Sequence, residues 1–182
     1  MYKTLTTVTL VANEGILLKT GDLHFLIDGL HHAPHHYPDF SPVSKENLKK
    51  IIQQQPPFKT LDYLLFTHGH GDHFSPFYTA KYLRYNTPKA VFMPQVATKE
   101  YQALLMLIKE KRQTHYELNC PLGQKRYIQL EKQIGLTLFQ TKHASKAYQD
   151  IPNYCFMLSI NEKNYLFIAD ADYDQAYFSE ML

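Results

Sequence analysis

The sequence feature that most constrains this fold is a cluster of metal-ligand side chains directly behind an apolar segment. Residues 61–67 form a compact apolar run that predicts a buried strand. Three imidazoles and one carboxylate follow within six residues: His68, His70, Asp72 and His73. Ser75-Pro76 then predicts a helix start, with serine as the N-cap and proline at the first helical position. Ligands bind at the carboxyl ends of strands in α/β architectures, so this loop predicts a ligand site.

The spacing of the cluster requires a bent loop. In an extended chain His73 would face away from His68, because successive side chains alternate between the two sides. Gly69 and Gly71 permit a curl, since neither has a Cβ and both can adopt positive φ. Burying these groups together without a cation would be costly, and zinc prefers imidazole nitrogen and carboxylate oxygen. A divalent metal site is therefore favoured over the alternative of ordinary loop residues.

Length and composition indicate one domain. The chain has 182 residues, of which 45% are hydrophobic, so we expect a single domain over 1–182 with one substantial core. The formal net charge is +2, and the Lys and Arg residues are scattered, which does not indicate a nucleic-acid partner. Cys120 and Cys155 form no CxxC pair and are expected to be free buried thiols.

Targeting and membrane signals are not found in the sequence. The N-terminus does not combine a basic start, a long apolar run and a small-residue cleavage site. The longest apolar runs span a handful of residues, far fewer than the roughly 20 that cross a bilayer. We therefore expect a cytoplasmic protein with reduced thiols and no membrane partner.

The remaining patterns predict a mixed order of strands and helices. Strands are expected over 4–12, 15–20, 24–28, 61–67, 90–93, 126–130, 135–141, 154–160 and 165–169, and helices over 44–55, from 75 to about 85, and over 98–111. The stretch 29–42 shows neither periodicity and is expected to be a loop. This order suggests two sheets with helices packed outside them.

A family resemblance follows from these residues. The segment Thr67-His68-Gly69-His70-Gly71-Asp72-His73 resembles the His-x-His-x-Asp-His signature of the metallo-β-lactamase superfamily, and it follows an apolar strand as in that family. The resemblance implies an αββα sandwich of the α+β or α/β class, with two mixed sheets and helices outside. The family also begins with hairpin strands that end in an aspartate. Asp28 matches this residue and would support the metal loop without ligating the ion.

The resemblance implies further ligands late in the chain. His143, after a late strand, would complete a three-histidine site, and His115 is its competitor. Asp170 matches the family's bridging aspartate. Ala169 stands where the family usually has glycine, and Asp172 is an alternative bridging ligand, because it lies on the same face by strand periodicity.

The implied chemistry is hydrolysis. His68, His70 and His143 would hold one ion and leave a position open for water, whose pKa the ion lowers so that hydroxide becomes the nucleophile. Asp72, His73 and Asp170 would hold a second ion, and Asp72 would also act catalytically by orienting the attacking water or passing on its proton. We expect one or two zinc ions, with manganese or iron as alternatives. His70 stands where the family's diiron oxygen-reducing branch has glutamate, which favours hydrolysis over redox chemistry.

The expected substrate is a small molecule with an ester, lactone, amide or phosphodiester bond. Family members generally continue to a final histidine that ligates the second ion, whereas this sequence ends at Leu182 without one. We therefore expect either that the chain is truncated, lacking the last strand and helix of the family, or that its second site is incomplete and binds weakly. The alternatives are a phosphodiesterase or nuclease of the same superfamily, and a noncatalytic metal-bound module.

The residues of two regions near the site could have several roles. The sequence does not indicate the oligomeric state. The loop histidines His31, His32, His35 and His36 could contact substrate, bind a metal or be solvated, and solvation is the favoured interpretation. Lys146 and Tyr148, soon after His143, are candidate substrate contacts.

Overall fold

The computed structural model describes residues 5–32 and 40–182. It divides the chain into two compact units, one ending at Glu117 and one beginning at Leu118. Each unit contains its own β-sheet. The expectation of a single domain stays a prediction.

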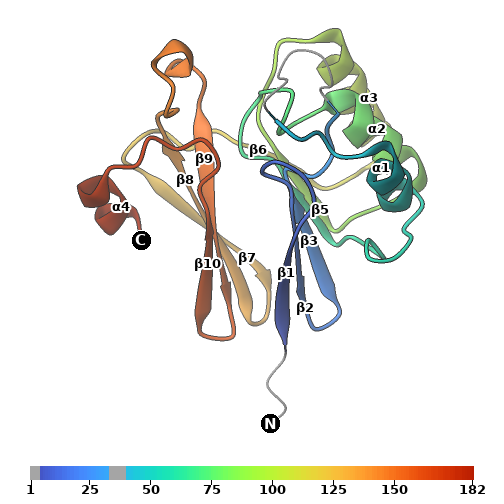
Figure 1. The fold of residues 1–182 in the computed structure, drawn as a ribbon, viewed down its shortest axis with the longest axis horizontal. Coiled ribbons are helices and arrows are strands. Elements are labelled where there is room, and N and C mark those ends of the chain that lie inside the picture. The colour runs from blue at the N-terminus through green and yellow to red at the C-terminus, as the bar shows by residue number, and fades with distance from the viewer. Residues whose placement is uncertain (1–4, 33–39) are drawn as a thin grey trace. The chain divides into compact units, whose positions relative to one another are not determined.

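The first unit contains a six-stranded mixed sheet in the order β1-β2-β3-β4-β5-β6 (Figure 1). Its first three strands form antiparallel hairpins: β1 (Thr6–Leu10), β2 (Ile16–Thr20) and β3 (Leu23–Ile27). The next three add in parallel: β4 (Tyr63–Leu65), β5 (Ala90–Met93) and β6 (His115–Glu117). Because β3 and β4 are parallel, their carboxyl ends lie next to each other at one edge of the sheet.

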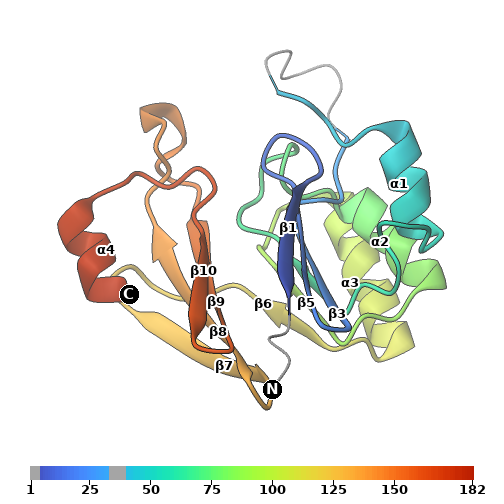
Figure 2. The ribbon, with the colours of Figure 1, turned by 60° about the horizontal axis from the view of Figure 1, so that its bottom comes forward.

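Three helices of this unit lie on one face of the sheet: α1 (Lys45–Ile52), α2 (Pro76–Tyr85) and α3 (Lys99–Lys111), as Figures 1 and 2 show. Each has a side-chain N-cap, in which the hydroxyl of Ser44, Ser75 or Thr98 accepts a hydrogen bond from a backbone N–H of the first turn. The buried faces of the helices join the sheet in one hydrophobic cluster, which includes Leu48, Tyr82 and Leu104. This packing fixes the start of α2 behind the histidine loop.

The second unit is a four-stranded sheet in the order β10-β9-β8-β7, formed by β7 (Lys125–Glu131), β8 (Ile134–Thr141), β9 (Asn153–Ile160) and β10 (Lys163–Phe167). A short 3-10 helix (Lys146–Tyr148) lies between β8 and β9, and α4 (Gln175–Met181) follows β10. Phe178 and Met181 of α4 pack against Phe139 and Cys155 of the sheet.

Most predicted elements are confirmed, and the α+β class is confirmed with them. The predicted strand over 61–67 is shorter, because only Tyr63–Leu65 pair as β4. The strand β6 and the helix α4 were not predicted: β6 is three residues long, and α4 presents only two buried residues. Two mixed sheets were predicted. The first sheet does contain both parallel and antiparallel strand pairs, whereas all three strand pairs of the second sheet are antiparallel.

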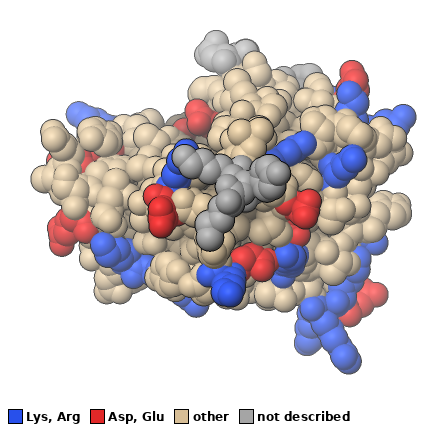
Figure 3. All heavy atoms as spheres, turned by 90° about the horizontal axis from the view of Figure 1, so that it is seen from below, with Lys and Arg blue, Asp and Glu red and all other residues tan. Residues whose placement is uncertain are grey.

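Charged side chains of both signs are interspersed on the face drawn in Figure 3. Among the described residues, no helix is both long and apolar enough to cross a membrane.

Candidate functional site

The loop that carries the histidine cluster connects β4 to α2. It is closed by two backbone hydrogen bonds, in which the N–H groups of His73 and Phe74 donate to the carbonyl oxygen of His70 over 3.1 and 2.9 Å. The loop curls without the positive φ that Gly69 and Gly71 are free to adopt, because the glycines with positive φ in the described chain are Gly21 and Gly123. At Gly69 the small size matters instead, since an added Cβ would lie 2.6 Å from Cγ1 of Val96.

Asp28 is the buried carboxylate that holds this loop. It follows β3 with φ 45° and is 1% exposed, and its carboxylate accepts two hydrogen bonds from Thr67. The Thr67 N–H donates to Oδ1 over 2.8 Å, and the Thr67 hydroxyl donates to Oδ2 over 2.6 Å. The bond to the Thr67 N–H connects the residue after β3 with the residue directly before His68.

Asp28 also orients His73. The Nδ1 of His73 lies 2.9 Å from Oδ2 of Asp28, and both side chains are buried. In a neutral ring the Nδ1–H donates to the carboxylate, which leaves the lone pair on Nε2. That Nε2 lies 3.9 Å from Oδ2 of Asp72, so a nitrogen and an oxygen donor face the same space.

His68 and His70 bring two ring nitrogens together. The Nε2 of His68 and the Nδ1 of His70 are 2.9 Å apart, and His68 is fully buried. Two nitrogens bound to one tetrahedral zinc ion, each at about 2.0–2.1 Å, are about 3.3 Å apart. A few tenths of an ångström of movement would admit an ion between them, so this donor pair fits a divalent metal.

A further histidine of the first unit is buried beside this loop. His31 is 0% exposed, so its predicted solvation is wrong. Burial, with a smaller contribution from the nearby charge of His73, lowers the pKa of His31 to about 4. His32 is half-buried, and its Nδ1 lies 3.0 Å from the carbonyl oxygen of Val43. His35 and His36 lie outside the described residues.

The late ligands predicted from the sequence come together within the second unit. His143 forms an isolated antiparallel bridge with Ala171, and the N–H of Ala144 donates to the carbonyl oxygen of Asp170 over 2.8 Å. These bonds place Oδ2 of Asp170 3.1 Å from Nε2 of His143. Asp172 is exposed, so the geometry favours Asp170 as the partner of this histidine.

The tautomer of His143 has a consequence for metal binding. The Ser145 N–H donates to Nδ1 of His143 over 3.0 Å, which leaves the proton of the neutral ring on Nε2, facing Asp170. For an ion to bind Nε2, this proton has to move to Nδ1, and the Ser145 N–H then has to turn away from Nδ1. Metal binding at this half-site therefore requires the other tautomer of His143 and a local change at Ser145.

Other residues singled out in the sequence occupy different environments. The ring of Tyr148 packs edge-on against His143 with centroids 5.4 Å apart, whereas the competing histidine, His115, is exposed on β6. Cys120 and Cys155 are free and buried, as predicted. Burial raises the pKa of the Cys155 thiol to about 12, which keeps it protonated and unreactive at neutral pH.

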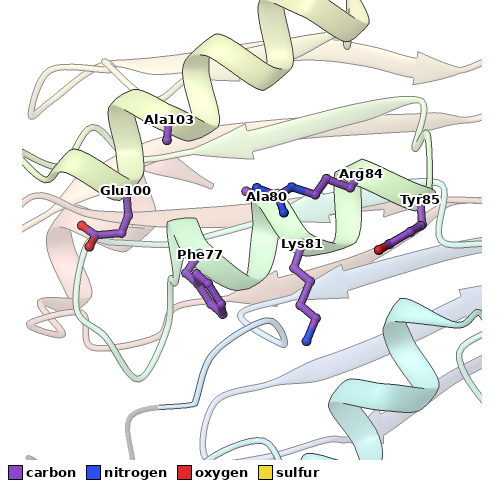
Figure 4. A pocket seen from close by; sticks show the side chains of 7 residues that line it. All are labelled: Phe77, Ala80, Lys81, Arg84, Tyr85, Glu100 and Ala103. Carbon is purple, nitrogen blue, oxygen red and sulfur yellow. The ribbon is translucent and has the colours of Figure 1, made fainter.

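A separate depression lies on α2 and α3 (Figure 4). It is lined by Phe77, Ala80, Lys81, Arg84, Tyr85, Glu100 and Ala103. None of the predicted ligands contributes to it, so it is distinct from the histidine loop.

Comparisons with known proteins identify the fold. No protein-family model and no curated protein matches the sequence. Solved structures do match, at low identity. CmlA, a diiron β-hydroxylase from Streptomyces venezuelae, matches with a TM-score of 0.57 and 15% identity over 92% of this chain and 30% of its own.

Two hydrolase-type structures also match. A candidate metal-dependent hydrolase from Veillonella parvula gives a TM-score of 0.58 at 13% identity, covering 97% of this chain and 66% of its own. Igni18, a metallo hydrolase from Ignicoccus hospitalis, gives 0.52 at 14% identity, covering 91% and 61%. The chain thus spans less than two thirds of each. It has the metallo-hydrolase fold of the metallo-β-lactamase type, as the resemblance implied.

Proposed function

We propose that this protein is a metal-dependent hydrolase whose metal ligands are the residues expected from the sequence, His68, His70, Asp72, His73, His143 and Asp170. One observation carries the proposal: Nε2 of His68 and Nδ1 of His70 lie 2.9 Å apart, next to a His73 ring held by buried Asp28. A carboxylate–imidazole pair of this kind is the usual support of a metal-ligating histidine. The metallo-hydrolase fold supports the same conclusion.

The proposed ligands divide into two sets. His68, His70 and His143 would hold one ion, and Asp72, His73 and Asp170 would hold the second. A divalent ion supplies two things in such a site: it acidifies water and it polarises a carbonyl or phosphoryl oxygen. Asp72 is 5% exposed and adjoins Nε2 of His73, and in this proposal its carboxylate would orient the attacking water or accept its proton.

We propose zinc as the metal and a small ester, lactone, amide or phosphodiester as the substrate. Three imidazoles with one open position are the donor set of a catalytic zinc site. A histidine at position 70 offers a neutral nitrogen where a carboxylate would favour iron.

Turnover before and after chelation tests this function. Purified protein is assayed with generic ester, lactone and phosphodiester substrates, then treated with chelator and reloaded with zinc. We expect activity that chelation abolishes and zinc restores. His68→Ala should lose at least about a hundredfold in kcat/KM, in line with loss of an electrostatic element of the site. The variant His115→Ala, which changes an exposed histidine of the same unit, should match the wild type.

Two outcomes would contradict the proposal. Zinc-loaded protein with no chelator-sensitive turnover on any of the three substrate classes would favour a noncatalytic metal-bound module. Protein that retains iron and consumes oxygen in place of hydrolysing these substrates would favour redox chemistry.

A further inference from the structure

His31 is a buried polar side chain that the proposed ligand sets do not use. It is 0% exposed, and within residues 5–32 and 40–182 neither Nδ1 nor Nε2 has a hydrogen-bond partner. Buried polar groups in native proteins are nearly always partnered, because an orphaned donor or acceptor retains its full cost of desolvation. A ligand that is not a described protein group is the simplest partner for this ring.

An isolated bridge brings the backbone at His31 close to the histidine loop. Leu30 and Phe74 form this parallel bridge, and both side chains belong to the hydrophobic cluster of the first unit. His31 and His73 are the immediate chain neighbours of the bridged residues, so their backbones lie near each other. The two rings are also within electrostatic range, since a positive charge on His73 disfavours protonation of His31.

We infer that His31 supplies a nitrogen donor to the second ion of the centre, the ion assigned above to Asp72, His73 and Asp170. The inference rests on the proposed function, and it adds a fourth protein ligand to a set that otherwise has three. Four ligands complete a tetrahedral zinc shell, and a neutral imidazole is among the ligands that zinc prefers.

His32 provides a matched comparison. It is the next residue, it is also a histidine, and its Nδ1 is engaged by the carbonyl oxygen of Val43. A general effect of losing a histidine from this segment would appear in both His31 and His32 variants. An effect of losing a metal ligand would appear only in the His31 variants.

The test is a zinc titration of the metal-free full chain against a chromophoric chelator, together with thermal unfolding of the metal-free protein. We expect the wild type to bind two equivalents, the second more weakly. His31→Leu should weaken the second equivalent by at least about tenfold and leave the first unchanged. Its metal-free melting temperature should equal or exceed that of the wild type, because the substitution removes an orphaned buried polar group. His32→Leu should leave both affinities unchanged.

A purely structural role for His31 gives a different pattern. Unchanged affinity for the second equivalent in His31→Leu would overturn the inference, whatever the melting temperature. If His31→Leu fails to fold, the same titration is made with His31→Gln, which keeps a polar side chain but not the imidazole. We expect His31→Gln to show the same loss of affinity for the second equivalent. A wild type that binds no zinc would overturn the proposed function itself, whereas wild-type binding with unaffected His31 variants would overturn only this inference.

Discussion

At the residue scale, Asp28 is the group on which the order of the histidine loop depends most. Its carboxylate accepts hydrogen bonds from the N–H and hydroxyl of Thr67 and from Nδ1 of His73. The N–H of Asp28 donates to the carbonyl oxygen of Leu65, so both backbone and side chain of Asp28 bind the β4 segment. A change at this residue should therefore affect metal binding and stability together.

Asp28→Asn tests this role. Asparagine keeps the shape but removes the charge, and its amide NH₂ cannot accept the bond from His73. We expect zinc affinity to fall by about 10–100-fold, as for other outer partners of metal ligands. The metal-free protein should lose roughly 1–3 kcal/mol of stability through the unmatched buried groups. Asp22→Asn, in the exposed turn between β2 and β3, is the control. Equal zinc affinities for the two variants would show that Asp28 does not orient the ligand.

The buried ring of His31 makes a pH-dependent contribution to stability. Its pKa is lowered from 6.5 to about 4, so between these pH values the unfolded chain binds a proton that the folded chain excludes. The stability of the metal-free protein should therefore be undiminished above pH 6.5 and fall as the pH drops towards 4, by up to about 3 kcal/mol from this residue. Urea unfolding at several pH values, in chelator, measures this. His31→Leu should reduce the slope, and an identical slope would contradict the assignment.

Most candidate ligands could be predicted from the sequence, because metal-ligating residues occur in short motifs with a recognisable spacing. Sequence reasoning proposed Asp28, His68, His70 and His73, which the structure brings together in one loop region. It missed the burial of His31, because that depends on the bridge between Leu30 and Phe74, which are far apart in the sequence. It pointed to the conformational freedom of Gly69, whereas the structure shows that the lack of space beside Val96 is the constraint at this position.

At the element scale, predictions succeeded where a cap or a strong periodicity marks the element. Serine or threonine caps define α1, α2 and α3, and alternating apolar residues define the hairpins. Short elements such as β6 carry too few residues to show a pattern, so only their pairing in the sheet defines them. The face-to-face packing implied by the αββα resemblance stays a prediction.

The turn after β10 provides a test at this scale. Ala169 has φ 46°, in the left-handed region that disfavours residues with a Cβ and strongly disfavours β-branched ones. Ala169→Gly should maintain or raise stability by up to about 1 kcal/mol, whereas Ala169→Val should lower it by roughly 1–2 kcal/mol. Chemical unfolding of both variants measures this. Greater stability in Ala169→Val than in Ala169→Gly would mean that the turn does not adopt this conformation.

At the scale of the whole molecule, the proposed function takes its donors from two parts of the chain. His68, His70, Asp72 and His73 belong to the first unit, and His143 and Asp170 belong to the second. An ion that binds only the folded protein stabilises it by mass action. Bound zinc should therefore raise the stability of the folded chain.

The central proposal is that His143 completes a three-histidine set with His68 and His70, and the zinc affinity of His143→Ala tests it most directly. Chelator competition is measured at neutral pH on the wild type, His143→Ala and His115→Ala. The account predicts that His143→Ala binds its first zinc equivalent at least about tenfold more weakly than the wild type, and that His115→Ala does not differ from the wild type. An unchanged first affinity in His143→Ala would contradict the role of His143 as the third histidine, and a loss confined to His115→Ala would assign that role to His115.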